Sequence, residues 1–187
     1  MLSAEEATGI LERAELICSE EAVSRAVADM AAAITAELSH SHPLVLSVMG
    51  GAVVFTGQLL PRLAFPLDFD YVHVSRYDNE IRGGDISWRT IPRESVRGRV
   101  VLVLDDILDE GITLAVIRDW VLGHGAAAFY SAVFAEKCLG RAKPVEANFV
   151  GIVVPNCYVF GFGMDIHGAW RNLPAVYALR EPPRTPD

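Results

Sequence analysis

The chain has 187 residues, of which 51% are hydrophobic and 21% are charged, and its formal net charge at pH 7 is -8. This length and composition suit one folded domain with a sizeable core and argue against a disordered chain. The acidic balance argues against a general nucleic-acid-binding surface, although a local site can still bind an anion.

Cysteine usage and the N-terminal segment bear on the compartment. Cys18, Cys138 and Cys157 are odd in number and show no C-x-x-C spacing, so the sequence predicts neither a disulfide framework nor a zinc site. The N-terminal segment lacks the basic start and apolar block of a signal peptide. No apolar run approaches the length of a membrane span. The sequence therefore predicts a cytoplasmic protein without a membrane partner.

Helical and extended patterns alternate along the chain. Apolar residues recur every three or four positions from Glu20 to Leu38, which predicts an amphipathic helix. A short apolar strand, Leu44 to Val48, follows and runs into Gly50-Gly51. Further helices are expected at residues 52–63 and 112–125, and further strands at residues 68–77, 99–104, 128–134, 149–154, 158–162 and 176–179.

The order of these elements predicts the fold class. Strand, helix and strand in alternation indicate an α/β fold with a mainly parallel central sheet flanked by helices. Residues 99–104 form a continuous apolar run, which is typical of a strand buried on both faces. Residues 78–95 are polar and have no sustained period, and we expect them to leave the core as an excursion.

An acidic cluster follows that buried strand. In LDDILDEGITL, the carboxylates Asp105, Asp106, Asp109 and Glu110 crowd a Gly-Ile-Thr turn, although like charges this close raise one another's pKa. The metal-binding strand of a P-loop ATPase would require a loop ending in Gly-Lys-Ser/Thr, which GGAVVFTGQ lacks. A receiver domain fits poorly because the cluster lies mid-chain and runs directly into the turn. A solvated helix start needs fewer acids.

The combination of an apolar strand, D-D-I-L-D-x-G-x-T and a helix resembles the phosphoribosyl-diphosphate (PRPP) signature of type I phosphoribosyltransferases. VMGGAVVFTGQLLPRL resembles the pyrophosphate loop and next helix of the hypoxanthine-guanine members. VSRY, AEKCLGR and PNCYVFGFGMDIHGAWRNLPAVYAL are similar to their covering loop, base-binding lysine segment and C-terminal segment. The resemblance implies the type I phosphoribosyltransferase fold in one domain, residues 1–187. Its core would span about residues 40–155, with a small hood from the N-terminal segment and about residues 156–180.

The activity implied by the resemblance is purine salvage. Such an enzyme transfers phosphoribosyl from PRPP to hypoxanthine, and to guanine, and releases pyrophosphate with Mg²⁺ as cofactor. Carboxylates beside the sugar accept hydrogen bonds from its hydroxyls and stabilise the developing positive charge, while Mg²⁺ prefers oxygen ligands. The resemblance also implies a homodimer or homotetramer. A xanthine-preferring enzyme and a non-catalytic nucleotide-binding regulator on the same fold remain alternatives.

Site residues are implied position by position. Asp109 corresponds to the general acid/base that faces the purine N7, and Lys137 to the lysine that hydrogen-bonds the 6-oxo group. Tyr158 corresponds to the aromatic residue that stacks on the base, and Val159 offers backbone groups to it. The PRPP-binding positions are Gly50, Gly51, Asp105, Asp106, Gly111, Ile112, Thr113 and Arg171; the metal-binding positions are Asp105, Asp106 and Asp165; the covering loop contributes Ser75 and Tyr77.

Three positions depart from the family pattern. Met49 stands where the pyrophosphate loop commonly has lysine, Glu110 where threonine is usual, and Ile112 where lysine is often found. These departures leave more of the phosphate binding to backbone amides and magnesium, and we expect the Glu110 carboxylate to point away from the phosphate. The five histidines show no pattern typical of a site, and His73 is expected to be an ordinary strand residue.

Overall fold

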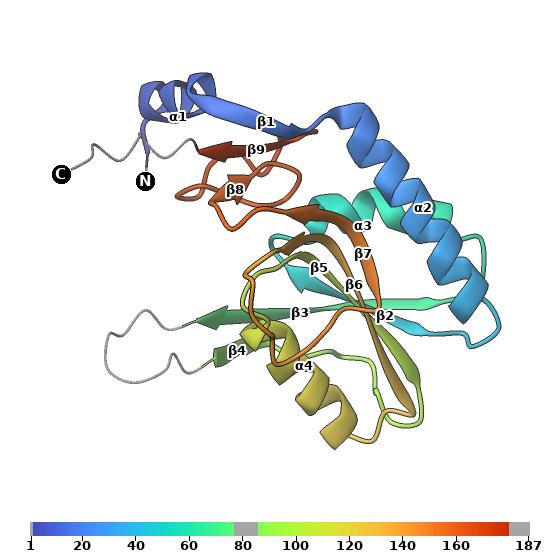
Figure 1. Cartoon of the computed structure of the whole chain (residues 1–187). Helices are drawn as coiled ribbons and strands as arrows, with labels where there is room; N and C mark the ends of the chain where they lie inside the picture. Colours follow the sequence, from blue (N-terminus) through green and yellow to red (C-terminus); the bar gives the residue numbers. More distant parts are fainter. Residues whose placement is uncertain (1, 77–85, 180–187) are drawn as a thin grey trace.

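The computed structural model describes residues 2–76 and 86–179 (Figure 1). Two sheets organise this part of the chain: a six-stranded sheet of order β4-β3-β2-β5-β6-β7 and a three-stranded sheet of order β1-β9-β8. The strands of the larger sheet are β2 (Leu44–Met49), β3 (Asp68–Arg76), β4 (Ile86–Thr90), β5 (Val100–Leu108), β6 (Ala128–Lys137) and β7 (Phe149–Val154). Neighbouring strands are parallel except β3 and β4, which confirms the predicted α/β class.

Helices cover both faces of the central sheet because β5 alternates its apolar side chains between them. Leu102 and Leu104 join a buried cluster with residues of α2 (Glu20–Leu38) and α3 (Val53–Leu59). Val101 and Val103 join a second cluster with residues of α4 (Ile112–Gly123). Figure 1 shows α2 and α3 on one side of the sheet and α4 on the other. The continuous apolar run thus serves two cores at once.

The second sheet is formed by segments from the two ends of the chain. It consists of β1 (Ala14–Cys18), β8 (Val159–Phe160) and β9 (Val176–Leu179), paired antiparallel. Helix α1 (Ala4–Glu12) precedes it, capped by Ser3 and Glu6 in a reciprocal capping box. Neither α1 nor β1 is among the elements predicted above, although the Ser-x-x-Glu spacing at Ser3 is typical of a helix start. No helix in the described residues combines the length and apolar character needed to cross a membrane.

Element boundaries agree closely where the local pattern is strong. Helix α2 and strands β7 and β9 have the predicted bounds, whereas β8 is shorter than expected. The predicted excursion contains β4, which pairs with β3 and places Trp88 with its ring centroid 5.2 Å from that of Trp120 on α4. Strand β5 continues past Leu104 to Leu108, because Asp105 and Leu108 keep their register with β6. The first acids of the cluster therefore belong to a strand, and Asp109 begins the turn.

Asp70 on β3 fastens the segment after β4 to the central sheet. Its buried carboxylate accepts hydrogen bonds from the backbone N–H groups of Tyr71 at 2.8 Å, Arg93 at 2.5 Å and Glu94 at 3.0 Å. Burial alone would raise the pKa of Asp70, but these donors outweigh it and hold the pKa below its ordinary value.

Replacing Asp70 by asparagine is expected to lower the free energy of unfolding by about 1–3 kcal/mol at pH 7, because an amide turns its NH₂ group toward N–H donors. A depressed pKa stabilises the folded state above the ordinary pKa, and this contribution is lost as the pH falls through the lowered pKa. The difference between parent and Asp70→Asn should therefore shrink below about pH 4 in urea unfolding. Asp119→Asn, on the exposed face of α4, is the control, and an equal loss there would contradict this role.

Candidate active site

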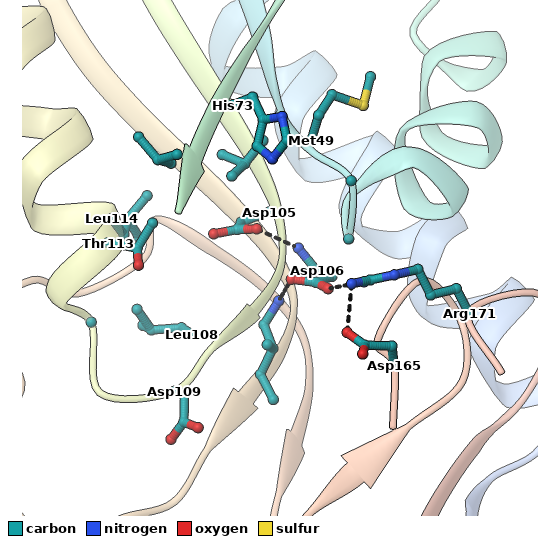
Figure 2. Close-up of a pocket in the computed structure, with 16 residues that line it drawn as sticks. Met49, His73, Asp105, Asp106, Leu108, Asp109, Thr113, Leu114, Asp165 and Arg171 are labelled. Carbon is teal, nitrogen blue, oxygen red and sulfur yellow. Dashed lines mark hydrogen bonds and ion pairs between the residues drawn. The ribbon is translucent and has the colours of Figure 1, made fainter. Parts of the chain in front are cut away.

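A cavity of about 390 Å³ opens at the carboxyl ends of β2, β3 and β5 (Figure 2). Such edges of parallel sheets are where ligands usually bind. A smaller cavity of about 210 Å³ adjoins it and shares Asp106, Asp109 and Asp165. The first cavity brings together Gly50, Gly51, Asp105, Asp106, Asp109, Gly111, Thr113, Asp165 and Arg171, and the second adds Lys137, Tyr158 and Val159.

Three predicted site residues lie elsewhere or cannot be placed. Ile112 lines neither cavity, and the residue is 42% exposed at the start of α4. Ser75 belongs to β3, but its side chain is outside the description. Tyr77 lies outside the described residues. Their expected roles stay predictions.

Two adjacent aspartates form the buried acidic wall of the larger cavity. The Asp106 N–H donates to the Asp105 carboxylate at 3.0 Å, and the Ile107 N–H donates to the Asp106 carboxylate at 2.8 Å. Burial raises the pKa of both carboxyl groups, and the charge of Asp106 raises that of Asp105 further. The pair therefore resists carrying two negative charges unless a cation approaches it.

This wall fits a magnesium ion better than a transition metal. Among the described residues, no three His, Cys, Asp or Glu side chains converge as a metal cage. Mg²⁺ usually needs only one or two protein carboxylates and completes its shell with waters and substrate phosphates. Asp105 and Asp106 offer oxygen donors of that kind. Asp165 adds a third carboxylate to the cavity, which contacts Arg171 at 2.5 Å and accepts from the Gly168 N–H at 2.7 Å.

Arg171 joins the C-terminal segment to the acidic wall. Its guanidinium contacts Asp165 at 2.5 Å, lies 3.9 Å from Asp106 and donates to the Gly163 carbonyl at 2.6 Å. Figure 2 shows the Arg171 side chain directed between the two aspartates. The arginine partly offsets the acidic charge and fixes one wall of the cavity to another.

Two glycines allow the loop after β2 and the C-terminal segment to approach the acidic wall closely. A Cβ atom on Gly51 would overlap the Asp106 carboxylate, and a Cβ atom on Gly163 would overlap the Gly51 carbonyl. Gly163 also has a φ of 100°, a backbone conformation that residues with a side chain rarely adopt. The backbone of this loop is therefore held between the acidic wall and the C-terminal segment.

The turn between β5 and α4 has the form of an anion cradle. Gly111 has a φ of 81° and precedes the first turn of α4, and both Gly111 and Thr113 line the larger cavity. The first N–H groups of a helix have no partner within the helix, so this end of the cavity suits an anion. Glu110 lines neither cavity, and its carboxylate pairs with Arg141 at 3.0 Å. As expected, the Glu110 carboxylate points away from the turn that is suited to the phosphate.

Asp109 and Lys137 connect the two cavities. The Lys137 ammonium donates to the Asp109 carboxylate at 2.6 Å; the lysine side chain is 13% exposed and that of the aspartate 43%. Asp109 lines both cavities, whereas Lys137 lines only the smaller one. A proton acceptor and a cationic donor are thus placed side by side where a planar ring could enter beside Tyr158.

Several residues that line or support the two cavities are not among the predicted site residues. His73 lines the larger cavity, Ile107 lines both cavities, and Met164 lines the smaller one. Lys143 lies behind the site, with its ammonium donating to the Leu108 carbonyl at 3.0 Å, the Lys137 carbonyl at 2.7 Å and the Glu136 carboxylate at 3.0 Å. A lone lysine in a polar loop gives no local signal for such a role.

Replacing Lys143 by methionine is expected to lower the free energy of unfolding by about 2 kcal/mol, because it leaves buried acceptors unpaired. Its side chain is only 7% exposed, and it ties the end of β5 to the end of β6. Thermal and urea unfolding measure the loss. Arg141→Met, in the same loop but 68% exposed, is the matched control and should cost well under 1 kcal/mol. Equal losses in the two variants would show that the buried hydrogen bonds of Lys143 do not stabilise the ends of β5 and β6.

Known proteins are similar to this chain in sequence and in fold. Residues 15–167 match the phosphoribosyl transferase domain family. The hypoxanthine-guanine phosphoribosyltransferase of Bacillus subtilis is 30% identical over 167 residues, which cover 89% of this chain and 93% of that protein. The bifunctional protein TilS/HprT of Listeria innocua is 34% identical over 167 residues, and the chain spans about a quarter (26%) of its length. The solved hypoxanthine phosphoribosyltransferase of Trypanosoma cruzi superposes with a TM-score of 0.82 at 28% identity, over 90% of this chain and 97% of that one.

Proposed function

The chain belongs to the phosphoribosyl transferase domain family, and from that premise we propose that it is a purine salvage enzyme. It transfers the phosphoribosyl group of PRPP to hypoxanthine, and to guanine, and releases pyrophosphate. The observation that carries the proposal is the pair of adjoining cavities with Asp109 in the wall of both. One cavity offers donors and acids suited to a sugar phosphate, and the other offers a lysine and an aromatic ring suited to a purine.

The residues divide the reaction between them. A purine nitrogen attacks the anomeric carbon, the bond from that carbon to the pyrophosphate oxygen breaks, and the purine proton passes to Asp109. Lys137 donates to the 6-oxo group, and its ion pair with Asp109, at 2.6 Å, places the carboxylate beside the base. Tyr158, 50% exposed at the mouth of the smaller cavity, stacks on the base, and Val159 presents its backbone to it.

PRPP occupies the larger cavity in this proposal. The 5′-phosphate accepts from the α4 backbone and Thr113, beside Gly111, and the pyrophosphate lies along Gly50 and Gly51. Asp105 and Asp106 accept hydrogen bonds from the ribose hydroxyls, and Arg171 binds the leaving group. Magnesium, when bound, neutralises part of the pyrophosphate charge, and Asp105, Asp106 and Asp165 are the residues that would hold it. The enzyme assembles as a homodimer or homotetramer, which sedimentation measurements test.

The decisive experiment is a product assay with PRPP, Mg²⁺ and each of hypoxanthine, guanine and xanthine. Pyrophosphate and the matching nucleotide should appear with hypoxanthine and guanine. Faster turnover with xanthine would correct the preferred base and keep the reaction class. Absence of pyrophosphate with all three bases would overturn the enzyme proposal and favour a binding protein.

A further inference from the structure

We propose that His73 is a ligand of the diphosphate group of PRPP and supplies the side-chain donor that position 49 lacks. The inference rests on the proposed function, because it takes PRPP as the occupant of the larger cavity.

The register of β2 and β3 places His73 directly beside Met49. The two residues are paired in the parallel ladder, and both line the larger cavity. Side chains of paired residues emerge on the same face of a sheet, and Figure 2 shows the His73 ring next to Met49, on the Asp105 side of the cavity. Met49 leads directly into Gly50 and Gly51. The imidazole therefore stands at the loop that the proposal assigns to the diphosphate.

The larger cavity is lined by more negative than positive side chains, so a diphosphate bound there needs further N–H donors. Four carboxylates line the cavity, those of Asp105, Asp106, Asp109 and Asp165. Among the described lining residues, Arg171 is the one with a permanent positive charge, and it divides its N–H donors between Asp165, the Gly163 carbonyl and any bound phosphate. A diphosphate adds several negative charges to this setting. His73 is the other described lining residue whose side chain bears nitrogen.

The two neighbouring side chains differ in what they can donate. A thioether has no hydrogen to donate, whereas imidazole carries an N–H in its neutral form and two when protonated. The His73 ring is half-buried and has no hydrogen-bond or ion-pair partner in the described part of the chain. Its N–H suits a phosphate oxygen.

The test compares His73→Leu with His73→Gln, which keeps a side-chain N–H donor. Binding of magnesium pyrophosphate is measured by calorimetry without purine, and KM values are measured for PRPP and for hypoxanthine. We expect His73→Leu to weaken pyrophosphate binding about 10- to 100-fold, as loss of a hydrogen bond to a charged group does, and to raise the KM for PRPP in parallel. His73→Gln should retain part of the affinity, and the KM for hypoxanthine should stay near the parent value.

A lysine at position 49 is expected to restore the affinity for pyrophosphate that His73→Leu loses. The double variant Met49→Lys with His73→Leu should regain much of the lost affinity, because a lysine on the paired strand position brings an ammonium group to the same end of the cavity. His40→Leu, which lines neither cavity, should bind pyrophosphate like the parent. Circular dichroism checks that each variant is folded.

The outcomes separate the inference from the function on which it rests. If folded His73→Leu and His73→Gln bind magnesium pyrophosphate as tightly as a catalytically active parent, the His73 assignment is wrong and the enzyme proposal stands. If the parent binds no pyrophosphate and releases none with any base, both fall.

Discussion

Replacing Asp109 by asparagine is expected to lower kcat by about 10²- to 10⁴-fold, the usual contribution of a general acid or base, with little change in the KM for PRPP. The amide has nearly the shape of the carboxylate and can still accept from the Lys137 ammonium, now 2.6 Å from the aspartate oxygen. It cannot take up the purine proton. The substitution therefore removes a transition-state interaction and leaves ground-state binding largely intact.

Steady-state kinetics with hypoxanthine and PRPP varied in turn measure this effect. Asp119→Asn changes an exposed aspartate on α4 and should leave both parameters unaltered. Turnover of Asp109→Asn at the parent rate would remove Asp109 from the chemistry. A raised KM with unchanged kcat would instead make it a binding residue.

Replacing Gly51 by alanine is expected to reduce kcat/KM for PRPP by at least about 100-fold, the order of loss that a misplacement of about 1 Å produces in a preorganised site. The added methyl group would overlap the Asp106 carboxylate, so either the loop or the acidic wall must move. Both line the proposed PRPP cavity. Kinetics with varied PRPP and calorimetry with magnesium pyrophosphate measure the loss.

Two other glycines serve as comparisons for Gly51→Ala. A Cβ atom on Gly57, inside α3, meets nothing within 4 Å, so Gly57→Ala should keep activity and gain about 0.5–1 kcal/mol of stability. A Cβ atom on Gly50 also meets nothing within 4 Å, and Gly50→Ala should lose much less activity than Gly51→Ala. Equal damage at the two loop positions would refute the steric explanation.

The acidic cluster shows how one short segment serves several environments. Asp105 and Asp106 lie on β5 and form the buried acidic wall of the larger cavity. Asp109 begins the turn and pairs with Lys137, and Glu110 pairs with Arg141. The four carboxylates therefore do not share one solvent-exposed patch. Asp105 and Asp106 still repel one another, whereas Asp109 and Glu110 each have a cationic partner.

The sequence by itself determined the elements whose signals are local. Helix α2 follows from apolar residues at helical spacing, and its start is fixed by Ser19, which accepts from the Ala22 N–H. The apolar run of β5 and the alternation of elements predicted the α/β class, and the cluster from Asp105 to Thr113 placed the candidate site. These features depend on neighbours in the chain, so they can be seen in one sequence.

Only the tertiary structure decided which distant residues meet. Strand β1 pairs with β9 near the other end of the chain, Lys143 ties β5 to β6, and His73 comes to lie beside Met49. Each depends on strand order and register, which set contacts between residues far apart in sequence and leave no periodic trace in the chain. His73, which no local sequence pattern singles out, thus becomes a candidate ligand because of the strand next to it.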